Sequence, residues 1–259
     1  MSVTNLEFAM RTDRGMVREN NEDAVGGDLS AGLVVLADGM GGANAGEVAS
    51  QLAVEMLINE LVVTRAPAAR VPEREAIQAA MQRVNRALLD IAQNVPEYRG
   101  MGTTVTMGCF QRNRLTFAHI GDSRLYRLRN GVLERLTRDH TLIQELVELG
   151  EFESEDEALQ AGVSQNILTR AFGSEADVLF DLEDAETRNG DLFLFCSDGL
   201  TNMLTDEAIR EFLEQSDTSL MDLIDTLIER ACLNGGADNI SVILARVVDN
   251  DDGNNKGTW

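Results

Sequence analysis

Residues 33–42 read LVVLADGMGG. The apolar run 33–37 predicts a buried strand, and it stops at Asp38, directly ahead of a glycine-rich segment. This order puts a carboxylate at the open end of a strand, followed by backbone that reaches conformations closed to other residues. A strand with an ordinary turn explains the stretch equally well in isolation, because Asp and Gly are common turn residues.

The same setting recurs further along the chain. Three more aspartates stand at a predicted strand terminus with glycine adjacent or close by, so that the full set is Asp38, Asp122, Asp198 and Asp238. Loops that follow strand ends lie close together at the edge of a sheet. The repeated pattern therefore predicts a cleft lined by carboxylates from distant parts of the chain.

Such a cluster favours a hard divalent cation. Neighbouring carboxylates resist ionising together unless a cation lies among them, and oxygen ligands favour Mg²⁺ or Mn²⁺ over zinc. No His or Cys cluster has zinc spacing. Two such ions about 3.5–4 Å apart can share a carboxylate, lower the pKa of a bridging water and steady a phosphoryl group. Arg18 supplies further positive charge.

A polar cluster at residues 18–23, RENNED, precedes a predicted strand at 24–25. One interpretation is a plain polar turn. The other is that Arg18 forks onto a phosphate while Glu22 and Asp23 hold metal-bound waters. The motifs of other enzyme classes are missing from the sequence. It has no phosphate loop for a nucleotide, no Gly-x-Ser-x-Gly nucleophile elbow, and no Arg about five residues after Cys196 to complete a cysteine phosphatase.

The overall composition limits the classes of binding partner. The chain has 259 residues, a formal net charge of −22 and a pI near 4.3, so neither nucleic acid nor an anionic membrane is an expected partner. Three distant cysteines indicate free thiols in a reducing compartment. With no signal-peptide pattern and no apolar run near the ~18 residues of a membrane span, the expected location is the cytoplasm.

Hydrophobic periodicity predicts strands alternating with amphipathic helices in one domain, 1–248. An acidic segment at 139–170, called the flap segment below, reads as a lid or an insertion, and the polar tail 249–259 is predicted to be disordered. The arginines between 112 and 138 either guide a phosphorylated partner or are solvated strand charges. His119 is interpreted as a packed strand residue. Strands are predicted at 5–10, 24–25, 33–37, 103–110, 114–120, 124–128, 178–182, 192–196 and 240–248, and helices at 44–63, 73–93, 139–150, 154–161, 206–215 and 219–232, with Asn44, Ser154 and Thr205 as caps.

These motifs closely resemble the bacterial form of the metal-dependent serine/threonine protein phosphatases, the protein phosphatase 2C family. The matching segments follow the family's order and span about residues 6–248. They are RENNED at 18–23, ADGMGG at 37–42, GTT at 102–104, GDSR at 121–124, SDG at 197–199 and DN at 238–239.

The resemblance implies an α+β fold, a four-layer α-β-β-α sandwich of two antiparallel sheets flanked by helices. It implies that Asp38 bridges two Mn²⁺ or Mg²⁺ ions and that the carbonyl of Gly39 completes one shell. Asp198 and Asp238 would bind the other ion, and Asp122 with Asp198 a possible third.

For the remaining residues, the resemblance implies that Arg18 grips the substrate phosphate and that Glu22 and Asp23 order metal waters. Two departures stand out. Met40 replaces the His that serves eukaryotic members as a general acid, although bacterial members often carry Met here. Residues 161–165, AGVSQ, lack a His-Pro pair often found in the flap.

The implied function is Mn²⁺- or Mg²⁺-dependent hydrolysis of phosphoserine and phosphothreonine on proteins by a metal-activated water, reversing a bacterial Ser/Thr kinase. The expected partners are phosphorylated proteins and that kinase, and the chain is expected to be a monomer. Two alternatives stay open: a phosphatase of a phosphorylated anti-sigma-factor antagonist, and a catalytically weak pseudo-phosphatase that only binds.

Overall fold

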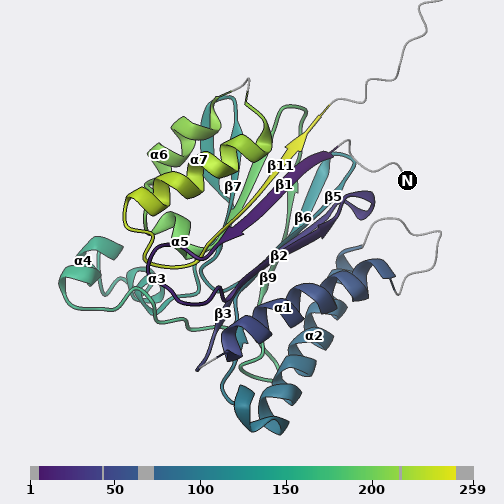
Figure 1. Ribbon diagram of the computed structural model, residues 1–259, viewed down its shortest axis with the longest axis vertical. Helices are drawn as coiled ribbons and strands as arrows, with labels where there is room; N and C mark the ends of the chain where they lie inside the picture. The colour runs from purple at the N-terminus through teal and green to yellow at the C-terminus, as the bar shows by residue number, and fades with distance from the viewer. Residues whose placement is uncertain (1–5, 43, 64–72, 216–217, 249–259) are drawn as a thin grey trace, which may run out of the picture.

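Two antiparallel β-sheets stack face to face, and helices cover the outer face of each (Figure 1). The computed structural model describes residues 6–42, 44–63, 73–215 and 218–248. One sheet has the order β1 (Leu6–Asp13), β11 (Ile240–Val247), β10 (Leu192–Cys196), β7 (Arg124–Arg129) and β8 (Val132–Arg135). The other has the order β2 (Asp23–Asp28), β3 (Leu33–Met40), β5 (Val105–Gln111), β6 (Arg114–Ile120) and β9 (Asp181–Glu186), and the short β4 (Gly102–Thr103) pairs with the end of β3.

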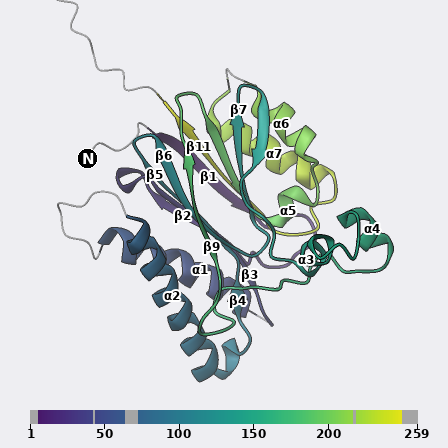
Figure 2. The same ribbon diagram turned by 180° about the vertical axis from the view of Figure 1, so that it is seen from behind.

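The helices form two separate outer layers. Helix α1 (Ala45–Ile58), which continues into a π-helical turn η2 (Asn59–Val63), and helix α2 (Arg74–Asn94) cover the sheet that contains β3. Helices α5 (Asp198–Thr201), α6 (Asp206–Leu213) and α7 (Leu220–Leu233) cover the sheet that contains β11. The flap-segment helices α3 (Leu142–Glu148) and α4 (Glu155–Gln160) project at the side (Figure 2). Short 3₁₀ turns lie at Leu29–Ala31 (η1) and Pro96–Tyr98 (η3).

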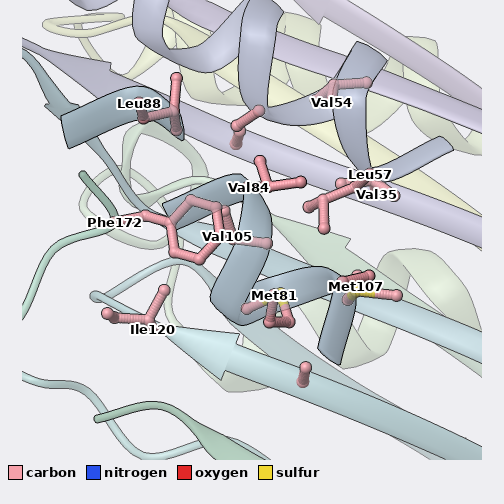
Figure 3. Close-up of a cluster of buried hydrophobic side chains, with 14 of the residues drawn as sticks. Val35, Val54, Leu57, Met81, Val84, Leu88, Val105, Met107, Ile120 and Phe172 are labelled. Carbon is pink, nitrogen blue, oxygen red and sulfur yellow. The ribbon is translucent and has the colours of Figure 1, made fainter. Parts of the chain in front are cut away.

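Apolar residues fill three layers because each central strand is covered on both faces. Successive side chains of a strand point to opposite faces. In β3, Val34 and Leu36 therefore pack between the sheets, whereas Leu33 and Val35 pack under α1 and α2. Figure 3 shows Val35 with side chains of α1 and α2 in that outer layer. This double coverage explains why the strands read as continuous apolar runs.

The predicted four-layer α+β sandwich is confirmed, and most predicted elements lie within a few residues of their observed bounds. Ser154 and Thr205 cap α4 and α6 as predicted, since their hydroxyls accept from Glu157 N and Ala208 N. His119 is buried in β6 between Thr106 Oγ1 and Arg138 O, at 3.0 Å from each.

Two local predictions need correction. Asn44 is the N-cap residue of α1 as predicted, and its carbonyl accepts from Val48 N at 3.2 Å, but its side chain makes no capping hydrogen bond, and its Oδ1 accepts from Asn20 Nδ2 at 3.4 Å. The strand predicted at 178–182 is observed as Asp181–Glu186, because this edge strand leaves polar side chains in solvent and its pairing with β6, not its hydrophobicity, sets its limits.

The tail predicted at 249–259 lies outside the described residues. Within the ranges that the structure does describe, no helix has the length and hydropathy needed to cross a bilayer.

Shortening Phe193 to alanine tests the layer between the sheets. Phe193 is fully buried and stacks edge-on to Phe110 with ring centroids 5.3 Å apart. We expect Phe193→Ala to lower the free energy of unfolding by about 3–5 kcal/mol, because the lost contacts leave a cavity. Urea denaturation followed by circular dichroism measures this. The exposed Leu233 gives a matched control: Leu233→Ala should change stability by less than about 0.5 kcal/mol, and equal effects of the two variants would contradict this packing.

Candidate metal centre

Strand pairing brings the four predicted aspartates to one edge of the sandwich. Asp38 at the end of β3 lies opposite Asp23 at the start of β2, and antiparallel β5 and β6 return the chain so that Asp122 follows at the same edge. In the other sheet, β10 ends at Cys196 beside the start of β11, which places Asp198 and Asp238 there too. The sheets then stack these two pairs across a shared cleft.

Hydrogen bonds hold the Asp38 backbone in place. Asp38 N donates to Thr104 Oγ1 at 3.0 Å, and Asp38 O accepts from Thr104 N at 2.8 Å and from Thr103 Oγ1 at 2.9 Å. Thr104 Oγ1 also lies 2.7 Å from Ser123 Oγ, in the turn that carries Asp122. The positions of Asp38 and Asp122 are therefore tied together through one threonine.

Two glycines permit the close approach of neighbouring backbone. A Cβ on Gly39 would lie 2.0 Å from Gly46 O, and a Cβ on Gly199 would lie 1.9 Å from Asn239 O. Any side chain at either position would force the chain apart next to an aspartate. Glycine beside Asp38 and Asp198 is thus required by the close packing of neighbouring backbone.

The carboxylate oxygens of Asp198 and Asp238 differ in their hydrogen bonds. Asp198 Oδ2 accepts from Asn202 Nδ2 at 3.1 Å, while its Oδ1 is buried without a hydrogen-bond partner. Asp238 Oδ1 accepts from Asn239 N at 2.8 Å, and its Oδ2 accepts from Arg18 Nη2 at 2.6 Å. Arg18 therefore rests on a carboxylate, and its side chain is 51% exposed.

Glu22 and Asp23, predicted to act together, occupy different environments. Glu22 lines the cleft, and its Oε2 lies against Gly46 near the start of α1. Asp23 is buried behind Asp38, where its Oδ2 accepts from Ser197 Oγ at 2.8 Å and its Oδ1 has no partner.

The cleft has a volume of about 250 Å³ and an adjoining hollow on the flap side has about 300 Å³. Asp122 and Asp198 line both spaces. The flap segment contributes Asn166 to both as well. Arg18, Glu22, Asp38, Gly39, Asp122, Asp198 and Asp238 all line the cleft, so seven of the eight predicted site residues meet there and only Asp23 lies behind it.

Burial and mutual repulsion disfavour the charged forms of these carboxyls. Burial, and after it the charge of Asp23, raises the pKa of Asp38 well above its usual range. Burial raises the pKa of Asp23 to about 7, against the opposing effect of the Ser241 and Ser197 hydroxyls. Burial followed by the charge of Asp198 raises the pKa of Asp122 to about 7, and burial and then Asp238 raise the pKa of Asp198.

The donor set fits a divalent cation. Buried carboxylate oxygens without partners at Asp23 and Asp198 and raised pKa values are what a missing positive charge produces, and carboxylate oxygens suit Mg²⁺ or Mn²⁺. Within the described ranges, no three Asp, Glu, His or Cys side chains are already drawn in around a single point.

Two supporting residues went unrecognised in the sequence. The buried Asn239 accepts from Glu22 N at 2.7 Å and donates to Arg14 O and Asn20 O, both at 2.9 Å, so it anchors the Arg18 loop to β11. Asp139 pairs with Arg124 at 2.7 Å and also with Arg135. An Asn directly after a ligand-type Asp was the available signal for Asn239, whereas the partners of Asp139 become apparent only in three dimensions.

The chain is similar to known protein phosphatases. The family profile described as Protein phosphatase 2C matches residues 15–231. The chain is 40% identical over 249 residues to the serine/threonine protein phosphatase PstP of Mycobacterium tuberculosis, which covers 96% of this chain but 46% of PstP. The chain thus spans about half the length of that relative. It is 38% identical to the serine/threonine phosphatase stp of Listeria innocua, covering 92% of this chain and 95% of stp.

Solved structures agree as well. The crystal structure of M. tuberculosis PstP superimposes with a TM-score of 0.84 at 39% identity, covering 94% of this chain and 99% of that one. The PstP catalytic domain in complex with two manganese ions gives a TM-score of 0.80 at 40% identity, with 94% and 99% coverage.

Manganese should stabilise this fold more at about pH 8 than at about pH 6. With folded-state pKa values of about 7, Asp23 and Asp122 favour the metal-free fold at low pH, and this contribution is lost as pH rises from about 4 through 7. A cation must displace those protons at pH 6 but not at pH 8. Thermal melts with Mn²⁺ and with a chelator, at both pH values, measure the metal-induced shift in melting temperature. The contribution of the two histidines to stability is the same with and without Mn²⁺, so it cancels in this shift. An equal metal-induced shift at both pH values would contradict this charge balance.

Proposed function

Since the chain belongs to the protein phosphatase 2C family of metal-dependent serine/threonine protein phosphatases, we propose that it hydrolyses phosphoserine and phosphothreonine on bacterial proteins with Mn²⁺ or Mg²⁺. The observation that carries this proposal is the meeting of Asp38, Asp122, Asp198 and Asp238 in one cleft with Arg18 at its side. The manganese complex of the PstP catalytic domain supports two ions as the working number.

Each carboxylate has a proposed task. Asp38 would hold two ions, and the carbonyl of Gly39 would serve as a further ligand of one of them. Asp198 and Asp238 would hold the other, and Asp122 with Asp198 would hold a third. When bound, such ions act as Lewis acids on phosphoryl oxygens and lower the pKa of a coordinated water.

Arg18 and Asp238 are proposed to change partners when the site is filled. The guanidinium donates to Asp238 Oδ2. If Asp238 held a cation, Arg18 would be free to fork onto the substrate phosphate. Glu22, beside the cleft, and Asp23, behind it, orient coordinated waters. No acid side chain stands where Met40 does, so the leaving oxygen takes its proton from solvent at the site.

The wider setting follows from the relatives. We propose one catalytic domain at 1–248 with 139–170 as its flap, a phosphoprotein substrate, and a cognate Ser/Thr kinase whose action it reverses. The free thiols of Cys109, Cys196 and Cys232 suit a reducing compartment, and the cytoplasm is the proposed location.

Asp198→Asn tests the metal ligands. Loss of one carboxylate charge should lower Mn²⁺-dependent hydrolysis of p-nitrophenyl phosphate at least ~100-fold, since even indirect support of a metal is worth about 10- to 100-fold. Calorimetry should show weaker Mn²⁺ binding. Metal-free thermal stability should stay equal or rise, because one repelling charge is gone. The surface control Asp225→Asn removes a carboxylate that forms an exposed ion pair with Arg11, and it should change none of the three. Full activity of Asp198→Asn would refute the assignment.

Arg18→Gln separates phosphate binding from metal binding. Losing a charge-assisted hydrogen bond worth about 1.5–3 kcal/mol should raise KM for a phosphopeptide roughly 10- to 100-fold. Mn²⁺ affinity should hold or improve, because Arg18 no longer competes for Asp238 Oδ2. Steady-state kinetics and calorimetry measure the two effects. A large fall in Mn²⁺ affinity with unchanged KM would show that Arg18 supports the ligand and does not bind substrate.

A further inference from the structure

A second groove opens beside the metal cleft, on the side away from the flap segment. Its volume is about 460 Å³, and its lining is mainly apolar, with Leu89 and Ala92 from α2 and Met101 from the segment before β4. Gly173 and Ser174 close the far wall. Figure 2 shows α2 descending to the same end of the molecule as β3 and β4. The groove thus lies where β3 delivers Asp38 to the cleft.

Met40 joins the two spaces. It lines both the metal cleft and the groove and is 36% exposed. Its methyl group lies over Gly102, where a Cβ would approach to 2.9 Å. A chain that runs from the cleft to the groove would pass over Met40, the residue that lines both spaces. A methionine at such a junction adapts its shape to different apolar partners.

The groove walls are fixed by the core. Phe172 is fully buried, and it exchanges backbone hydrogen bonds with Thr103 at 2.8 and 3.0 Å. Gly173 N donates to Asn85 Oδ1 at 2.7 Å, and Asn85 Nδ2 donates to Glu175 O at 2.8 Å. Figure 3 shows Phe172 packed among Leu88, Val84 and Val105. Binding in this groove requires little reordering of its walls, which limits the entropic cost.

One positive charge stands at the rim. Arg99 is exposed and lines the groove, and none of the ion pairs among the described residues includes it. In a chain of net charge −22, this is a place where an acidic group is attracted. The hollow on the flap side is lined instead by Asp122, Asp139, Glu155 and Asp198 together with Arg124, which already pairs with Asp139, so unpaired carboxylates there disfavour an acidic group.

We propose that this groove binds the segment of a phosphoprotein that flanks the phosphorylated residue, in a substrate with an apolar and an acidic side chain close to that residue. The apolar side chain packs on Leu89, Ala92 and Met101, and the acidic one pairs with Arg99. The phosphate end of the same chain lies in the metal cleft, and Met40 lies beneath the link. This assignment rests on the proposed phosphatase function and adds a substrate preference to it.

Charge reversal at Arg99 tests the groove. The substrates are phosphothreonine peptides that carry one Glu or one Lys at each position up to four residues on either side. Wild-type protein with Mn²⁺ should prefer Glu over Lys at one or two positions on one side. Arg99→Glu should reverse that preference there, with kcat/KM for the Glu peptide falling about three- to tenfold through KM. Hydrolysis of p-nitrophenyl phosphate, which has no flanking chain, should be unchanged.

A matched control and a second variant sharpen the test. Arg86→Glu makes the same charge change on α2, at an exposed residue that pairs with Asp177 outside the groove, and should leave every peptide preference intact. Leu89→Gln should raise KM for peptides with an apolar side chain near the phosphothreonine and not for alanine peptides.

The outcomes are distinguishable. If no peptide position responds to Arg99→Glu, or if Arg86→Glu acts equally, the groove assignment is overturned and the phosphatase function stands. Dimerisation abolished by Arg99→Glu, with peptide kinetics unaffected, would also overturn it in favour of a second copy of the chain. Absence of Mn²⁺-dependent hydrolysis of p-nitrophenyl phosphate by wild-type protein would overturn both.

Discussion

Repulsion among carboxylates at one edge of a β-sandwich is the constraint on which the site depends. Folding brings Asp38, Asp122, Asp198 and Asp238 to a common cleft, and burial raises the pKa of the first three. The fold tolerates this repulsion because residues outside the cluster fix the backbone around the aspartates. Thr104 clamps Asp38 to the Asp122 turn, and Asn239 ties the Arg18 loop to the strand beside Asp238. Because a hard cation relieves the repulsion among these carboxylates, the repulsion favours cation binding.

The sandwich makes such holding possible. Both faces of the central strands are covered, so strand ends cannot shift without exposing core residues. The same rigidity extends past the cleft, where Phe172 and Asn85 fix the groove next to Met40. The two spaces next to the cleft differ in charge. Carboxylates predominate in the hollow on the flap side, whereas Arg99 lines the groove. One scaffold thus sets both the chemistry and the direction in which a bound chain extends.

Local signals succeeded where a residue acts through its immediate neighbours, and failed where the partner is distant. Ser154 and Thr205 were predictable caps because a helix N-terminus lies within three residues. Asn44 looked identical in sequence, but its side chain contacts Asn20. The arginines after residue 112 were expected either to guide a partner or to be solvated. Arg124 and Arg129 instead pair with Asp139 and Asp191, at 2.7 and 2.6 Å, and their side chains are only 20% and 18% exposed.

The sequence alone determined the candidate metal ligands, because an aspartate at a predicted strand end with glycine adjacent or close by is a local pattern, and its repetition predicted that Asp38, Asp122, Asp198 and Asp238 meet. Only the tertiary structure decided that Asp23 lies behind the cleft while Glu22 lines it, that Arg18 rests on Asp238, and that a groove with Arg99 continues past Met40. The physical reason is that these arrangements depend on strand register and sheet stacking, which join positions as far apart as Arg18 and Asp238 and leave no periodic trace in the chain.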